Sequence, residues 1–191
     1  SVTIHGVNFH PGSAKGKMKN ALLMAQEFAA LLPAGETPAN TEGYEGFYHF
    51  TRMEGCESEA RMRYLIRDFS GEGFQKRKET MGRGAEELNR RYGPGTVEVD
   101  IRDQYYNMRE QIEPHMYLIH RAKAAMEAGG VLPQEVPIRG GTDGAQLSYR
   151  GLPCLNLCTG GVNFHSVYEY IPVSALQKMV EILIRLLTVE R

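Results

Sequence analysis

The feature that most constrains the fold is the order of two hydrophobic periodicities along residues 1–104. Alternation of apolar and polar residues predicts four strands, and apolar residues spaced three or four apart predict two helices between them. The resulting β-α-β-β-α-β order is typical of a ferredoxin-like, α+β fold. The predicted strands are Val2–Ile4, Phe47–Glu54, Glu59–Phe69 and Val97–Ile101, and the predicted helices run from Ser13, as the cap, to Leu32 and from Phe74 to Tyr92.

The pattern changes after residue 104 and predicts a second domain over residues 105–191. Helices and short apolar strands alternate there as α-β-α-β-α, which is too few elements for a complete doubly wound sheet. We therefore expect this domain to be the end of a larger α/β domain. Its predicted elements are a helix near 112–128, a short strand before Gly140, a helix Asp143–Arg150, a buried strand Leu152–Cys158 and a helix Val173–Val189.

Composition excludes several classes of protein. Lys and Arg total 22 against 23 Asp and Glu, so a strongly basic nucleic-acid binder is not expected. With 42% apolar residues the chain has enough apolar side chains for a core. No apolar run approaches the roughly 20 residues of a membrane span, and the most apolar segment, Val180–Val189, contains Glu181 and Arg185.

Cysteine usage and the start of the chain point to the cytoplasm. Cys56, Cys154 and Cys158 form no CxxC pair, and three cysteines cannot all form disulfides with one another, so a reducing compartment is predicted. No signal peptide precedes the first strand. Because Ser1 is not a methionine, we expect a cut inside a longer protein, with removal of a tag or of the first methionine as the equal alternative.

Common catalytic motifs are missing. The sequence contains no HExxH, no Cys/His set with zinc spacing, no GxSxG, no GxxxxGK[ST] and no GxGxxG. Two Gly-containing turns remain as candidates. His10 lies between a predicted strand and helix, where N–H groups favour an anion, but spacing alone favours the alternative of a surface histidine beside a capped helix. Arg139 precedes Gly140–Gly141, where its guanidinium can bind a carboxylate. The alternative is a solvated arginine in the connection between a strand and a helix.

Three further residues are candidates on position alone. His165 follows a predicted strand and can ligate a metal with Glu169 nearby, or it is a hydrogen-bonded structural histidine. Arg67 ends a predicted strand, and Asn107 lies at the junction of the two halves. Either can contact a substrate, while a surface ion pair or helix capping accounts for each as well.

Six runs occur in one fixed order along the chain: His10–Met18, Thr41–Phe47, Ile66–Phe69, Tyr105–Glu110, Pro137–Leu147 and Gly160–His165. Together they resemble the peptidase T family of bacterial tripeptide aminopeptidases, and the resemblance spans almost the whole chain. The members of this family are di-zinc exopeptidases related to carboxypeptidase G and aminoacylase.

The resemblance implies a two-zinc α/β catalytic domain carrying a ferredoxin-like lid that often mediates dimerisation. Residues 1–104 then correspond to the lid and residues 105–191 to the C-terminal segment of the catalytic domain. The family carries the catalytic Asp, the general-base Glu and most zinc ligands before the lid. By resemblance, His165 is the one zinc ligand here, although Ser166 stands where the family usually has glycine.

The resemblance also implies roles for the other candidates. His10 matches a lid histidine that steadies the tetrahedral oxyanion, in some relatives across a dimer, and Arg67, Asn107 and Arg139 match positions that bind the substrate backbone or carboxylate. We therefore expect a cytoplasmic, homodimeric, zinc-dependent tripeptide aminopeptidase, with this chain inactive alone. The alternatives are a non-catalytic dimerisation module and a related di-zinc exopeptidase or aminoacylase with another substrate.

Overall fold

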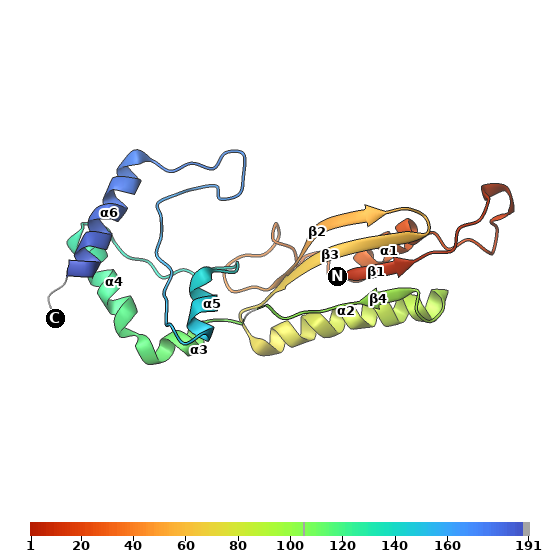
Figure 1. Ribbon diagram of the computed structural model, residues 1–191, viewed down its shortest axis with the longest axis horizontal. Helices are drawn as coiled ribbons and strands as arrows, with labels where there is room; N and C mark the ends of the chain where they lie inside the picture. The colour runs from red at the N-terminus through yellow and green to blue at the C-terminus, as the bar shows by residue number, and fades with distance from the viewer. Residues whose placement is uncertain (105, 189–191) are drawn as a thin grey trace. The chain divides into compact units, whose positions relative to one another are not determined.

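The computed structural model describes residues 1–104 and 106–188 of the chain. The chain divides into two compact units, residues 1–104 and residues 105–191. The first unit contains both the sheet and the longest helix (Figure 1). Its elements are β1 (Val2–His5), α1 (Ala21–Leu31), β2 (Phe47–Gly55), β3 (Glu59–Arg67), α2 (Gly71–Tyr92) and β4 (Val97–Val99), with a 3₁₀ turn at Pro11–Ser13.

The sheet of the first unit has four strands in the order β2-β3-β1-β4. Each neighbouring pair is antiparallel, with Val2 opposite Met62 on β3 and opposite Val99 on β4. This order, in which β1 and β3 occupy the centre, is the ferredoxin-like arrangement. The fold that the sequence predicts for residues 1–104 is therefore confirmed.

One face of the sheet forms the core with α1 and α2. Alternate strand residues on that face are buried together with one face of each helix, as the period-2 and period-3.6 patterns require. The opposite face carries charged side chains, including the exposed Arg61 and Arg63. The largest fully buried side chains of this unit are Phe28, Ile4, Met24, Met62, Met81, Leu88 and Val2.

The start of the first helix differs from the prediction. Asn20, not Ser13, is the N-cap of α1, and its side chain accepts hydrogen bonds from the backbone N–H groups of Leu22 (2.9 Å) and Leu23 (3.4 Å). Gly16 has a φ of 70°, a left-handed conformation that no helix contains. Residues 7–19 therefore form a separate protruding loop, which we call the His10 arm (Figure 1).

The second unit consists of helices in the residues that the structure describes. They are α3 (Arg109–Ile112), α4 (Tyr117–Ala128), α5 (Asp143–Tyr149) and α6 (Val173–Thr188), with a 3₁₀ turn at Glu113–His115. The predicted helix near 112–128 is divided because Pro114 lacks the N–H that a continuous helix needs. Thr142 caps α5 through a 3.1 Å hydrogen bond from the N–H of Ala145. Val189 of the predicted last helix lies outside the described residues.

The two strands predicted in this half are wrong for the described residues. No strand forms between 106 and 188, and the β pairing there is one isolated bridge between Val162 and Tyr170. A strand is stable when a neighbouring strand satisfies its N–H and C=O groups, and the elements around residues 152–158 are helices.

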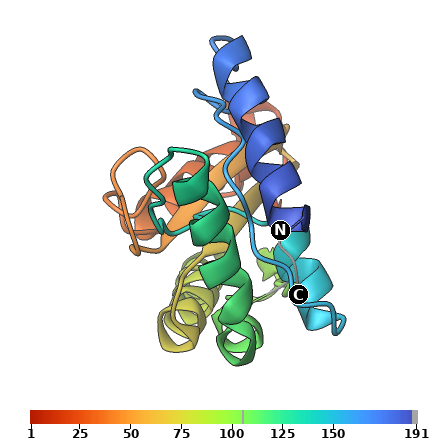
Figure 2. The same cartoon turned by 90° about the vertical axis from the view of Figure 1, so that its left-hand side faces the viewer.

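Helices α4 and α6 pack against each other, the second of them blue in Figure 2. Ala125, Met126 and Ile182 form their buried contact. The rest of α6 is largely exposed, and Val180 and Leu187 are 53% and 81% accessible. This helix thus presents an uncovered apolar surface.

Candidate functional site

The His10 arm begins and ends at a backbone bridge. Val7 and Lys19 exchange two hydrogen bonds of 2.8 and 3.0 Å, so the arm leaves the sheet at the end of β1 and returns immediately before α1. The Lys19 ammonium also donates to the carbonyl of Tyr92 at the end of α2. This closed base allows a mostly exposed loop to hold a defined position.

The histidine of the arm is oriented by the backbone of its own turn. His10 is the N-cap of the Pro11–Ser13 turn, and its Nδ1 accepts a hydrogen bond from the backbone N–H of Gly12 at 3.2 Å. In a neutral imidazole the other nitrogen, Nε2, then carries the proton. His10 is an exposed side chain that offers Nε2–H as a donor. A neutral donor of this kind suits a developing oxyanion.

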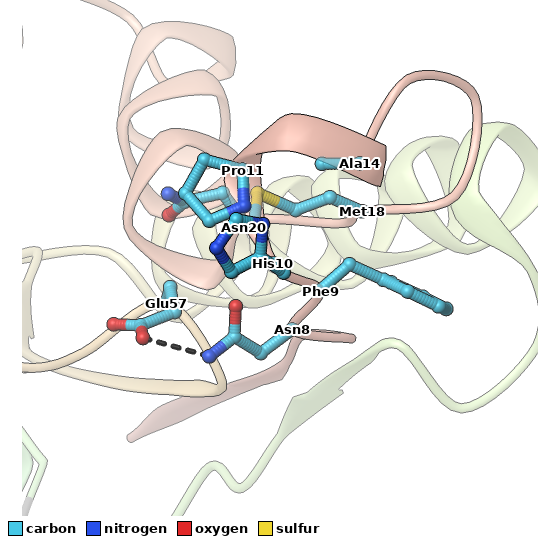
Figure 3. A pocket seen from close by; sticks show the side chains of 8 residues that line it. All are labelled: Asn8, Phe9, His10, Pro11, Ala14, Met18, Asn20 and Glu57. Carbon is cyan, nitrogen blue, oxygen red and sulfur yellow. Dashed lines mark hydrogen bonds between the residues drawn. The ribbon is translucent and has the colours of Figure 1, made fainter.

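An open pocket lies beside this histidine (Figure 3). Apolar surface from Phe9, Pro11 and Met18 meets polar groups from Asn8 and Glu57. The Asn8 amide donates to the Glu57 carboxylate at 2.8 Å. The pocket can take a small group that combines apolar and polar parts.

Arg67 lies at the other end of β3 from the His10 arm. The arm contacts Glu57, two residues before β3 begins at Glu59, and Arg67 is the last residue of the nine-residue strand. At about 3.3 Å per residue the strand spans roughly 26 Å. Within one lid the structure therefore does not bring His10 and Arg67 together.

Arg67 has hydrogen-bond partners near its position at the strand end. Its guanidinium donates to the Ile66 carbonyl at 2.9 Å and to the Gln104 amide oxygen at 3.5 Å. The next residue, Asp68, accepts from the partly buried guanidinium of Arg77, which also pairs with Glu36 at 2.8 Å. This ion network anchors the end of β3, so a side chain there has a rigid base.

The candidates in the second unit have separate local settings. The Asn107 side chain accepts from the N–H of Arg109 at 3.0 Å, and its carbonyl accepts from the Tyr149 hydroxyl at 2.8 Å. The Asn107 side chain thus closes a local turn onto the backbone at the start of α3, whose N-cap is Met108. Arg139 is partly buried in a segment without regular secondary structure before Gly140, where the predicted strand is absent.

His165 lies in a loop that the Val162–Tyr170 bridge closes. Its backbone has a φ of 68°, and Asn163 has a φ of 57°, both in the left-handed region that residues other than glycine rarely adopt. The Glu169 carboxylate accepts the His165 backbone N–H at 2.7 Å. The imidazole itself is exposed. Strained backbone of this kind is concentrated at functional sites.

A metal pair does not fit the residues of this chain by themselves. Across 1–104 and 106–188, no three His, Cys, Asp or Glu side chains gather as a metal site requires. His165 has one carboxylate near it, and that carboxylate is engaged by backbone. All three cysteines are free.

In the same described ranges, no helix has both the length and the apolar character to cross a membrane.

Sequence reasoning did not find Asn8 and Glu57. The two residues are 49 positions apart, and their side chains meet because the β2–β3 turn reaches the base of the arm. Neither lies in a motif, so only the sheet topology brings them together.

Comparisons with known proteins agree with the fold and the motifs. The sequence is 52% identical over 185 residues to the peptidase T of Bacillus subtilis and, equally, to that of Caldanaerobacter subterraneus, covering 97% of this chain and 45% of each relative. The chain thus spans about half the length of the curated relatives it matches. The resemblance to the peptidase T family is confirmed.

Solved structures share the fold. An aminopeptidase from Bacillus cereus superposes with a TM-score of 0.70 at 22% identity, over 97% of this chain and 49% of that one. A tripeptidase from Staphylococcus aureus gives 0.69 at 17% identity, with the same coverage. The model of the peptidase dimerisation domain matches residues 1–96, half of the chain, which therefore belongs to the peptidase dimerisation domain family.

Proposed function

We propose that this chain supplies the lid and the C-terminal catalytic segment of a zinc-dependent tripeptide aminopeptidase. The observation that carries the proposal is about 50% identity to proteins named peptidase T over 97% of the chain. Residues 1–104 are the lid, and residues 105–191 complete the catalytic domain. The names aminopeptidase and tripeptidase of the structural neighbours support the same reaction. The free cysteines support a cytoplasmic location.

A chimera tests this function directly. In it, our chain replaces the matching 45% of the Bacillus subtilis peptidase T, which supplies the remaining sequence. We expect the chimera to release the N-terminal residue of an unblocked tripeptide and to lose this activity with a chelator. The unmodified relative is the positive control. A folded chimera that hydrolyses no tripeptide contradicts the proposal.

In this proposal, zinc is bound by the complete enzyme and not by this chain alone. The described residues of this chain do not form a metal site, so the remaining ligands come from outside it and His165 is the one ligand that it contributes. The Glu169 bond to the His165 backbone holds the loop in its left-handed conformation. We derive the other roles from this chain's own side chains.

His10 stabilises the charge that develops on the attacked carbonyl oxygen. Its Nε2–H is available because Nδ1 is engaged by Gly12. This donor binds a negatively charged oxyanion more strongly than it binds the uncharged carbonyl oxygen of the substrate. Its effect therefore appears in the transition state.

His10 acts on the partner protomer of a homodimer. An extended tripeptide spans at most roughly 11 Å, far less than the length of β3 that separates His10 from Arg67 in one lid. Both residues therefore serve one substrate only if two protomers contribute them. The match to a dimerisation domain supports such a pair.

Mixed dimers test this arrangement. We expect chimeras with His10→Ala or Arg67→Ala to be impaired separately, and a co-expressed, doubly tagged mixed dimer to regain one intact site. If both residues served the same protomer, the mixed dimer would stay as impaired as its parents.

Light scattering on the unmodified 191-residue chain is expected to show a dimer. The Val180→Lys, Leu187→Lys double variant controls for association through α6, and a clean monomer contradicts the assembly.

Arg139 holds the substrate carboxylate, with Arg67 and Asn107 contacting its backbone. A fixed carboxylate grip by a planar guanidinium limits peptide length. Arg139→Ala in the chimera is expected to bring kcat/KM for tetrapeptides closer to that for tripeptides. Lys123→Ala, which removes a partly exposed cation that pairs with Glu135, is the matched control. A lower rate with unchanged tripeptide preference contradicts this role.

A further inference from the structure

The β2–β3 turn, residues 56–58, contacts the chain on both sides of the His10 arm. The N–H of Gly6, immediately before the arm, donates to the Ser58 carbonyl at 2.8 Å. The N–H of Ala21, just after the arm, donates to the Glu57 carbonyl at 2.9 Å. The turn therefore joins the two ends of the arm to the sheet.

Close packing at Gly6 keeps these segments in register. A Cβ atom at Gly6 would lie 2.2 Å from the Glu57 carbonyl oxygen and 2.6 Å from that of Lys19. Both neighbours are backbone atoms, which cannot move aside as a flexible side chain would. The end of β1, the end of the arm and the turn thus meet without room for even a methyl group.

One side-chain bond extends this anchoring into the arm. Asn8 donates from Nδ2 to Glu57 Oε1 at 2.8 Å (Figure 3). Asn8 lies two residues before His10, and both line the same pocket as Glu57. The acceptor is a half-buried carboxylate, and hydrogen bonds to charged groups are stronger than neutral ones.

We propose that Glu57 is a positioning residue that holds His10 in place through Asn8. The proposal rests on the oxyanion role of His10 given above. A catalytic donor must be held to about 0.5 Å, and an error of about 1 Å can cost 100-fold in rate. An exposed loop carrying such a donor needs a fixed contact beyond its base, and the Glu57 carboxylate supplies one.

Limited proteolysis of this chain tests the anchoring without any activity. Lys15 and Lys17 are exposed in the arm, so trypsin cleavage after them, followed by mass spectrometry, reports how often the arm opens. Losing one hydrogen bond through Glu57→Ala or Asn8→Ala is expected to speed this cleavage about 2- to 10-fold. Glu57→Gln keeps an acceptor oxygen and is expected to cleave nearly as slowly as the unmodified chain.

Kinetics of the chimera test the effect on His10. Glu57→Ala is expected to lower kcat for a tripeptide about tenfold with little change in KM, and Glu57→Gln is expected to restore most of it. In a His10→Ala background, Glu57→Ala is expected to cost nothing further, because a residue acting through His10 is not additive with it. Glu54→Ala is the matched control, since this exposed β2 carboxylate pairs with Arg52.

Each outcome is decisive. If His10→Ala leaves kcat unchanged, the role of His10 fails and this proposal fails with it, while proteolysis still reports the anchoring of the arm. If His10→Ala lowers kcat but Glu57→Ala does not, the positioning role alone is overturned. An equal loss from Glu57→Ala with and without His10 also overturns it, since the effect then does not pass through His10.

Discussion

Replacing His10 with alanine in the chimera is expected to lower kcat for a tripeptide by about 100- to 1,000-fold, with KM nearly unchanged. A donor aimed at a developing oxyanion contributes on the order of 3 kcal/mol, and it contributes in the transition state more than in the bound substrate. The Gly12 N–H on Nδ1 keeps the donating proton on Nε2. Steady-state kinetics over a range of tripeptide concentrations separates kcat from KM.

Two variants make the His10 result specific. His10→Gln keeps a neutral N–H donor and is expected to recover part of the loss. His49→Ala removes an exposed histidine on β2, in the same unit, and is expected to leave kcat unchanged. A His10→Ala chimera with full kcat, or with a raised KM alone, contradicts oxyanion stabilisation by this residue.

Replacing Phe28 with alanine is expected to destabilise the lid by about 3–5 kcal/mol, the usual cost of removing a buried phenylalanine ring. Phe28 is fully buried on α1. Its ring lies 6.4 Å from the Tyr64 ring on β3, and a Cβ at Gly84 on α2 would be 3.2 Å from it. The ring thus fills the space between α1, the sheet and α2.

Thermal unfolding followed by circular dichroism measures this loss. For a unit of 104 residues we expect the transition of the lid to fall by on the order of 15 °C. Leu23→Ala on the same helix is the matched control, because that side chain is 56% exposed and its loss is expected to change little. A Phe28→Ala transition within about 4 °C of the unmodified chain contradicts the packing described here.

The lid fold could be predicted because its pattern is local and its partners are present. Apolar residues alternate along Glu59–Arg67 and recur at helical spacing along Gly71–Tyr92, so each segment has one apolar face. The two apolar faces are buried in the same core. The start of α1 could not, since Ser13 and Asn20 both cap helices well and the left-handed Gly16 decides between them. In the second half, residues 152–158 are apolar enough for a strand, but the described part of the chain offers them no neighbouring strand to pair with.

The site was less predictable than the fold. Motif resemblance singled out His10, but the sequence predicts it directly before a helix, whereas it caps the 3₁₀ turn Pro11–Ser13 within the arm. The tautomer of its ring depends on a backbone N–H two residues on, which a sequence does not show. The Asn8–Glu57 contact depends on how the β2–β3 turn lies against the arm, so it follows from topology alone.

The central claim is that this chain supplies part of a catalytic site whose remaining metal ligands lie outside it. The most direct test compares tripeptide hydrolysis by the folded 191-residue chain with added zinc and by the chimera, each with and without chelator. We predict chelator-sensitive hydrolysis by the chimera and none by the chain alone. Chelator-sensitive hydrolysis by the chain alone would contradict the account, because its own histidines and carboxylates would then form a complete metal site.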